Sequence, residues 1–244
     1  MRLFYFLFLI SFSVVAQNPK LGVTITSITT DDISASNTEY HINYQIENKT
    51  SEELSFFLLP NALIANTASS LTLYPVYRMY QNGVFEDMDG PFFEYETEDE
   101  LEYAKIEDKT SAEAKKLINK IQTKQSYVGK YFYKKYKDEG GKSEDFQWIY
   151  QRQKLLNNII TLKPKETKSF TIKTLWNKNR FIKNDDLEFY LDENNTIEIE
   201  LILDLKTNLF KDQLSEEDLV KINVNPNFIR GDFVSNKMKI DFKE

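Results

Sequence analysis

Apolar and polar residues alternate in both outer parts of the chain, and a long stretch with helical spacing separates these two parts. Alternation with a period of two predicts β-strands that bury one face, whereas steps of three and four predict helices. The clearest alternation lies in residues 40–47 and 197–205, and the helical spacing covers residues 97–158. The sequence therefore predicts a mainly β protein with an α insertion.

Turn residues separate the alternating segments and predict where the strands end. Asn82-Gly83 between two short extended segments indicates a tight hairpin, because a type I′ turn needs positive φ at both central positions. Pro164 lies in a polar turn before an alternating segment that ends at Trp176. Further strands are expected in residues 21–26, 54–59, 71–80, 159–162 and 238–242.

The helical stretch divides into an acidic part and a basic part. Residues 86–108 are rich in Asp and Glu, and residues 109–137 are rich in Lys. Thr110 and Glu113 match a capping box, so Thr110 is expected to cap the basic helix. We expect the acidic segment and the basic helix to lie side by side and to form ion pairs with each other. The alternative is that the two charged segments form a surface that binds a charged partner.

Three segments of the β regions resemble the immunoglobulin-like β-sandwich of many exported bacterial proteins. They are Ile-Glu-Asn-Lys-Thr at residues 46–50, the apolar residues 54–59, and Leu-Lys-Pro-Lys-Glu-Thr-Lys-Ser-Phe-Thr-Ile at residues 162–172. The resemblance implies an antiparallel sandwich over residues 17–244, carrying a helical hairpin at about residues 97–158 between two strands. Two small β domains joined by that hairpin are the rival arrangement. A resemblance of fold style implies no activity.

The N-terminal segment has the composition of a secretory signal peptide. Arg2 precedes an apolar run that ends in small residues at Ala16, so residues 1–16 are expected to be removed before Gln17. The run is too short to span a membrane, which takes about 20 residues. No later segment is long and apolar enough to do so either. We therefore expect a secreted or periplasmic protein without a transmembrane segment after cleavage.

Composition excludes several kinds of chemistry. The chain contains no Cys and one His, so it has no disulfides, no thiolate metal site and no histidine-rich metal site. The single histidine, His41, lies on the polar face of a strand and is expected to be exposed. Asp87, Asp89 and Glu96 only faintly resemble a calcium loop, so no metal and no cofactor are predicted. The net charge of −7 argues against nucleic acid as a partner.

Aromatic and basic residues gather towards the end of the helical stretch and form the predicted binding surface. Rings with basic neighbours bind sugars and peptides, although packing of the same rings on the sandwich is the simpler explanation. The candidate binding residues are Tyr127, Tyr131, Tyr133, Lys134 and Trp148.

Two functions remain open. We favour an exported, non-catalytic binding or structural module whose helical insertion contacts an envelope or extracellular protein, a peptide or a glycan. The alternative is an enzyme that acts on glycans through carboxylates, since two of these groups suffice for glycoside hydrolysis. Because the sequence spacing singles out no pair of carboxylates in a cleft, no catalytic residue is assigned.

Overall fold

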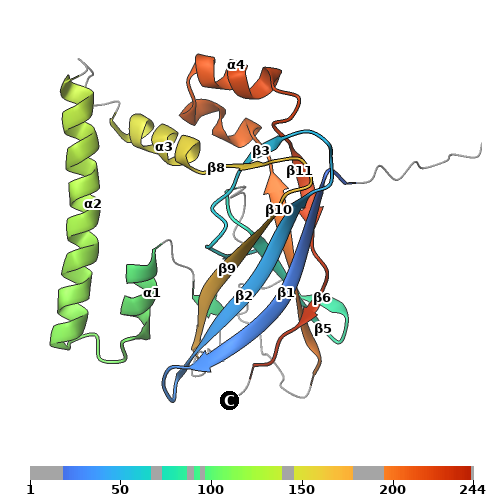
Figure 1. Cartoon of the computed structure of the whole chain (residues 1–244). Helices are drawn as coiled ribbons and strands as arrows, with labels where there is room; N and C mark the ends of the chain where they lie inside the picture. Colours follow the sequence, from blue (N-terminus) through green and yellow to red (C-terminus); the bar gives the residue numbers. More distant parts are fainter. Residues whose placement is uncertain are drawn as a thin grey trace, which may run out of the picture.

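The computed structural model describes residues 19–66, 73–86, 91–93, 97–138, 146–177 and 195–242. For residues 124–133, 135–137, 146–147 and 177 it describes the backbone alone. The fold is mainly β, with several antiparallel sheets and a few helices, and one sheet is curled into a half-barrel (Figure 1). The predicted signal peptide and the residues of the faint calcium loop, Asp87, Asp89 and Glu96, lie outside the described residues.

The first sheet joins strands from both ends of the sequence. Its order is β1-β2-β9-β7, formed by β1 (Leu21–Asp32), β2 (Asn37–Asn48), β9 (Thr167–Asn177) and β7 (Phe92–Phe93), and every pair is antiparallel. Tyr40, Ile42, Tyr44 and Ile46 of β2 are all buried, as their period of two predicts. The polar residues between them face the opposite side, so this sheet has one core face and one outer face.

The second sheet is built around β10 (Ile197–Leu205), most of whose residues are buried. Its main path is β11-β10-β5-β4, formed with β11 (Gly231–Val234), β5 (Val76–Gln81) and β4 (Ile64–Ala65). Strand β12 (Met238–Lys239) pairs with β10, and β6 (Val84–Glu86) pairs with β5. Asn82 and Gly83 have φ of 51° and 81°, which confirms the predicted hairpin between β5 and β6.

Two clusters of buried apolar side chains hold the fold together. The larger one includes residues of the first two sheets, among them Ile42, Tyr44 and Ile199. The smaller cluster contains Phe57 and Phe210. It joins a two-stranded sheet of β3 (Leu54–Phe57) and β8 (Ile159–Leu162) to the 3₁₀ helix η2 (Asn208–Gln213) and to α4 (Glu216–Val224).

The helical insertion lies between β7 and β8, and its described residues form three α-helices instead of the two of a hairpin. They are α1 (Glu98–Lys105), α2 (Ala112–Asp138) and α3 (Phe146–Asn157). Helix α2 stands at the outside of the molecule, and its main neighbours are α1 and α3 (Figure 1). The predicted pairing of acidic and basic parts occurs between α1 and α2, where Lys120 Nζ lies 2.8 Å from Asp99 Oδ1.

Candidate binding pocket

Helix α1 is attached to the outer face of the first sheet by an ion pair. Glu39 of β2 lies beside Leu175 of β9, which in turn lies beside Phe93 of β7, so these three side chains share the outer face. Lys105, in the last turn of α1, reaches down and pairs with Glu39, whose side chain is only 8% exposed. Burial acts to raise the pKa of Glu39, but hydrogen bonds from Lys105 and His41 outweigh it and lower this pKa. Glu39 therefore stays ionised beneath α1.

His41 takes part in the same polar network, and the expectation of a freely exposed histidine is wrong. Its side chain is 25% exposed, and its Nε2 atom lies 2.7 Å from Glu39 Oε1 and 3.5 Å from Asp31 Oδ2. Glu39 and His41 are two residues apart on one strand, so their side chains point to the same face. The ring thus links Asp31 to Glu39, the residue that pairs with Lys105 of α1.

A pocket opens next to this attachment, where the end of α1 meets the edge of the first sheet; we call it the helix–sheet pocket. Its volume is about 420 Å³, which is in the range of small-ligand sites. Two apolar side chains form its sheet side, Leu175 in the floor and Phe93, which is 44% exposed. The lining residues are Asn37, Pro91, Phe93, Tyr103, Ala104, Lys109 and Leu175.

Lys109 places a positive charge at the wall of the helix–sheet pocket. It follows α1 in the sequence and folds back, so that its Nζ atom donates to the carbonyl oxygens of Tyr103 and Ala104, the latter at 3.0 Å. The ammonium group also lies 4.6 Å from the centre of the Tyr103 ring. A cation at the carboxyl end of a helix is favourable because the last carbonyls carry partial negative charge. Burial lowers the pKa of Lys109.

The arrangement suits a ligand with an apolar body and one acceptor group. The aromatic and aliphatic lining takes up an apolar group, because its burial removes that surface from water. Two of the three N–H groups of Lys109 are engaged by α1, and the third has no acceptor among the described residues. A carboxylate or carbonyl of the ligand can accept from it. Asn37, which is 5% exposed, also lines the pocket, and its Nδ2 donates to the hydroxyls of Ser34 and Ser36.

The predicted binding residues lie elsewhere. Lys134 is exposed on α2, and Trp148 of α3 donates its indole N–H to the Asp212 carbonyl oxygen at 2.8 Å. Trp148 thus joins α3 to η2, although 38% of it remains exposed. The backbone places Tyr127, Tyr131 and Tyr133 in the second half of α2, but their side chains lie outside the described residues. Of the two candidates whose side chains are described, neither lines the helix–sheet pocket.

The pocket residues escaped sequence analysis because they come from separate segments. Asn37, Phe93, Tyr103 and Leu175 belong to β2, β7, α1 and β9, and none of them forms a motif with its sequence neighbours. One available signal was the capping box of Thr97 and Glu100, which begins α1 inside the stretch that composition marks only as acidic. A helix there brings Tyr103 and Lys105 onto the sheet.

Comparison with protein-family models, with curated proteins and with solved structures finds no match to this chain. Function must therefore be argued from the residues themselves. Within the described ranges, no helix is long and apolar enough to cross a membrane. No group of three or more His, Asp or Glu side chains in the same ranges is arranged to hold a metal ion.

Proposed function

We propose that this protein is an exported, non-catalytic binding module built on an immunoglobulin-like sandwich. In this proposal the helix–sheet pocket takes an apolar side chain of an envelope or extracellular protein, next to a carboxylate of that partner. The observation that carries the proposal is the pairing of an apolar floor, Leu175 and Phe93, with the ammonium group of Lys109 in one hollow. The outer part of α2, with Tyr127, Tyr131, Tyr133 and Lys134, supplies the wider contact surface.

The lining favours a peptide over a glycan as the ligand. Sugars are held by many polar groups around a ring, whereas Phe93, Pro91 and Leu175 offer apolar surface and few hydrogen bonds. Phe93 is partly exposed at the pocket, as expected for an aromatic anchor at a binding surface. A peptide with an aromatic or branched aliphatic side chain beside Asp, Glu or its own C-terminal carboxylate fits both features.

The glycan-acting alternative gains no support from this pocket. Among the described residues that line it, none is Asp or Glu, so the two carboxylates of a glycosidase have no place there. Two carboxylates do meet on β10 and β11, where Asp204 lies opposite Asp232. Burial and then Asp204 raise the pKa of Asp232, but neither residue lines the helix–sheet pocket.

Site-specific crosslinking tests the proposal directly. A photoreactive phenylalanine analogue replaces Phe93 in the cell, and the same analogue at Val84 is the matched control, because Val84 is 64% exposed and lies on β6 away from the pocket. We expect a protein crosslinked from position 93 and not from position 84. Its crosslinked residue should lie beside a carboxylate, and a synthetic peptide of that segment should bind the purified protein in calorimetry.

Substitutions separate the parts of the proposed site. Phe93→Glu and Lys109→Met should each weaken binding of that peptide at least tenfold, while Val84→Glu should leave it unchanged. Tyr131→Ala and Tyr133→Ala should weaken capture of the whole partner more than binding of the short peptide. Equal crosslinking from both positions, or turnover of a polysaccharide that one Asp→Asn or Glu→Gln change abolishes, would overturn the proposal.

A further inference from the structure

Strand β1 forms one edge of the first sheet, and among the described residues a cover on the outer side of that edge is seen at Ile25. Within the part of the chain that the structure describes, β1 pairs with β2 alone. At Ile25 the side-chain amide of Asn236 takes the place of a neighbouring strand: its Oδ1 accepts from the Ile25 N–H at 2.8 Å, and its Nδ2 donates to the Ile25 carbonyl at 3.3 Å. The register shifts just after Ile25, and this cover ends there.

The second half of β1 presents backbone groups that face away from β2. The Ile33 N–H donates to the Asn37 carbonyl at 3.0 Å, which identifies Asp32 and Thr38 as a pair that exchanges no hydrogen bond. Such pairs alternate along an antiparallel ladder, so the pairs of Thr30 with Tyr40 and of Ile28 with Ile42 are of the same kind. The N–H and C=O groups of Ile28 and Thr30 therefore point outwards, without a partner among the described residues.

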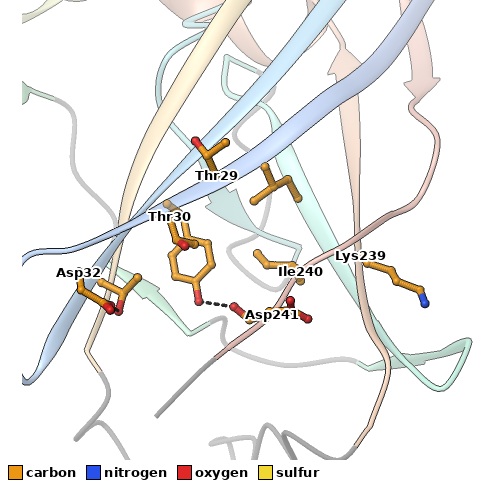
Figure 2. A pocket seen from close by; sticks show the side chains of 9 residues that line it. Thr29, Thr30, Asp32, Lys239, Ile240 and Asp241 are labelled. Carbon is orange, nitrogen blue, oxygen red and sulfur yellow. Dashed lines mark hydrogen bonds between the residues drawn. The ribbon is translucent and has the colours of Figure 1, made fainter.

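A slot runs beside this uncovered edge, between β1 and the C-terminal segment (Figure 2). Its volume is about 170 Å³, enough for one side chain. The Tyr40 hydroxyl donates to the Asp241 carbonyl at 2.6 Å and joins the two sides. Hydroxyl and carboxylate groups dominate the lining, which comprises Ile28, Thr29, Thr30, Asp32, Thr38, Tyr40, Lys239, Ile240 and Asp241.

The charge around the slot is mainly negative. Asp32 and Asp241 line it, and Lys239 is the one cation in the described lining. Burial, followed by the charges of Asp241 and Asp32, raises the pKa of Tyr40, as expected in a negative environment. Acidic residues on a strand edge discourage pairing with a second copy of the same strand, because like charges then meet in one ladder.

We propose that residues 27–32 of β1 accept an extended segment of another protein as an added strand, and that a Lys or Arg side chain of this segment enters the slot. Backbone hydrogen bonds to Ile28 and Thr30 supply the attachment, and the side-chain slot supplies the selectivity, as in other cases of strand addition. The carboxylates that repel a second copy attract a basic segment. This contact is separate from the helix–sheet pocket.

A short peptide tests the strand addition on the full chain. The probe is a fluorescent peptide of alternating Thr and Val with one central Lys, and binding is followed by anisotropy at low and high salt. We expect saturable binding that weakens with salt and at least tenfold with Lys→Glu in the peptide. N-methylation of the amides on one edge of the peptide should abolish binding, whereas methylation on the other edge should not. Equal binding of the two methylated peptides would overturn the proposal. So would a lack of binding by the unmethylated Lys peptide at millimolar concentration.

A matched pair of variants tests the protein side. Thr30→Pro removes the outward N–H of β1 and spares the bonds to β2, because proline is tolerated where the N–H faces away from the ladder. Thr30→Val keeps that N–H. We expect Thr30→Pro to lose binding of the Lys peptide and Thr30→Val to retain it, with the fold of each checked by thermal melting. If Thr30→Pro fails to fold, the methylated peptides still test the strand addition on the parent protein. Unchanged binding of the Lys peptide by a folded Thr30→Pro variant would refute the added strand.

Discussion

At the scale of single residues, Asn48 joins three segments of the chain through one buried amide. Its side chain is completely buried, and its Nδ2 donates to the carbonyl oxygens of Glu52 at 2.7 Å, Lys163 at 2.9 Å and Leu162 at 3.2 Å. Its Oδ1 accepts from the backbone and the hydroxyl of Thr50. Asn48 begins a sequence that matches the acceptor of N-glycosylation, but an amide buried in this way is not accessible to a glycan in the folded protein.

Removal of the Asn48 amide should destabilise the protein severely. Asn48→Ala leaves buried carbonyl groups without donors, and we expect a loss of roughly 2–4 kcal/mol in the free energy of unfolding. Urea denaturation followed by tryptophan fluorescence measures this loss. Thr50→Val is the control: it removes one hydroxyl and should cost about 1 kcal/mol. Equal losses of unfolding free energy in the two variants would show that the Asn48 amide is not the main link between these segments.

At the scale of secondary-structure elements, a partly buried ion pair joins α3 to α4. Arg152 donates from Nε to Asp218 Oδ2 at 2.5 Å and from Nη2 to Asp218 Oδ1 at 2.9 Å. Asp218 also completes the capping box of α4 by accepting from the backbone and the hydroxyl of Ser215. Hydrogen bonds from Arg152, and then from Ser215, prevail over burial and hold the pKa of Asp218 at about 2, below its ordinary 3.8.

The pair between Arg152 and Asp218 should give stability that disappears in acid. Since the folded pKa of Asp218 is lowered, its contribution is fully present above pH 4 and is lost as the pH falls through about 2. Arg152→Gln should therefore reduce the free energy of unfolding by roughly 1–2 kcal/mol at pH 6. The difference from the parent should become small near pH 2 and vanish below it. Urea titrations at several pH values measure it.

The control for this prediction lies in the same helix. Lys221→Gln removes an ion pair to Glu217 in which both side chains are mostly exposed. Exposed pairs are screened by water and salt, so no measurable change in stability is expected at any pH. A pH-independent loss in Arg152→Gln would mean that packing of Arg152, and not its charge, holds α3 to α4.

Local signals predicted the elements well where one residue type is required by the backbone. Asn82-Gly83 gives its hairpin because few other residues adopt positive φ at both positions. The cap of α2 shows the opposite case: Ser111 Oγ accepts from the Ala114 N–H, whereas Thr110 bonds to Asp108, so the predicted cap at Thr110 is wrong by one residue. Both hydroxyls are chemically able to cap, and the contacts of the preceding turn decide between them.

At the scale of the whole molecule, the two apolar clusters divide the described fold into a part built on the two large sheets and a part that contains η2 and α4. Ile199 is completely buried in the larger cluster. Phe57 lies in the smaller cluster, where its ring centre is 5.5 Å from that of Phe210 and 5.0 Å from that of Phe228. The smaller cluster brings β3, η2 and the segment after α4 together. Different parts of the molecule should therefore respond to the loss of each side chain.

A substitution in the larger cluster should affect the unfolding of the whole molecule, whereas one in the smaller cluster should affect only its own part. Ile199→Ala should lower the free energy of global unfolding by about 2–5 kcal/mol, because it opens a cavity in the central strand. Phe57→Ala should speed hydrogen exchange in α3 and α4 while the amides of β2 and β10 stay protected. Exchange measured by mass spectrometry distinguishes the two. Uniform loss of protection in Phe57→Ala would instead indicate a single cooperative unit.

The residues of the candidate site were harder to predict than the strands. A strand of this kind buries alternate residues whichever strands it pairs with, so the alternation in the sequence is enough to predict that Tyr40 and Ile42 are buried. The helix–sheet pocket depends on the placement of α1, whose Lys105 pairs with Glu39 of β2, and no local pattern encodes that contact. Likewise, no local pattern encodes the hydrogen bond from the Trp148 indole N–H to the Asp212 carbonyl oxygen.

The predicted export gives a further test at this scale. If residues 1–16 are a signal peptide, the protein recovered outside the cytoplasm should begin at Gln17. N-terminal sequencing of the protein from the cell envelope and the medium decides this. A substitution of Leu7 and Leu9 by Asp should retain the uncleaved chain in the cytoplasm. A recovered protein that still begins at Met1 would contradict the prediction.

The strand order also determines when each sheet can form during synthesis. Strand β2 needs β9 as its second neighbour, as in the pair of Tyr44 with Phe170, and β5 needs β10, as in the pair of Met79 with Ile199. A chain that emerges N-terminus first can form the β1–β2 hairpin early, but it waits for its last third before either sheet closes. Contacts so distant in sequence form slowly. The nascent chain therefore remains without closed sheets for most of its synthesis. During that time its apolar strands are exposed and are expected to need a chaperone.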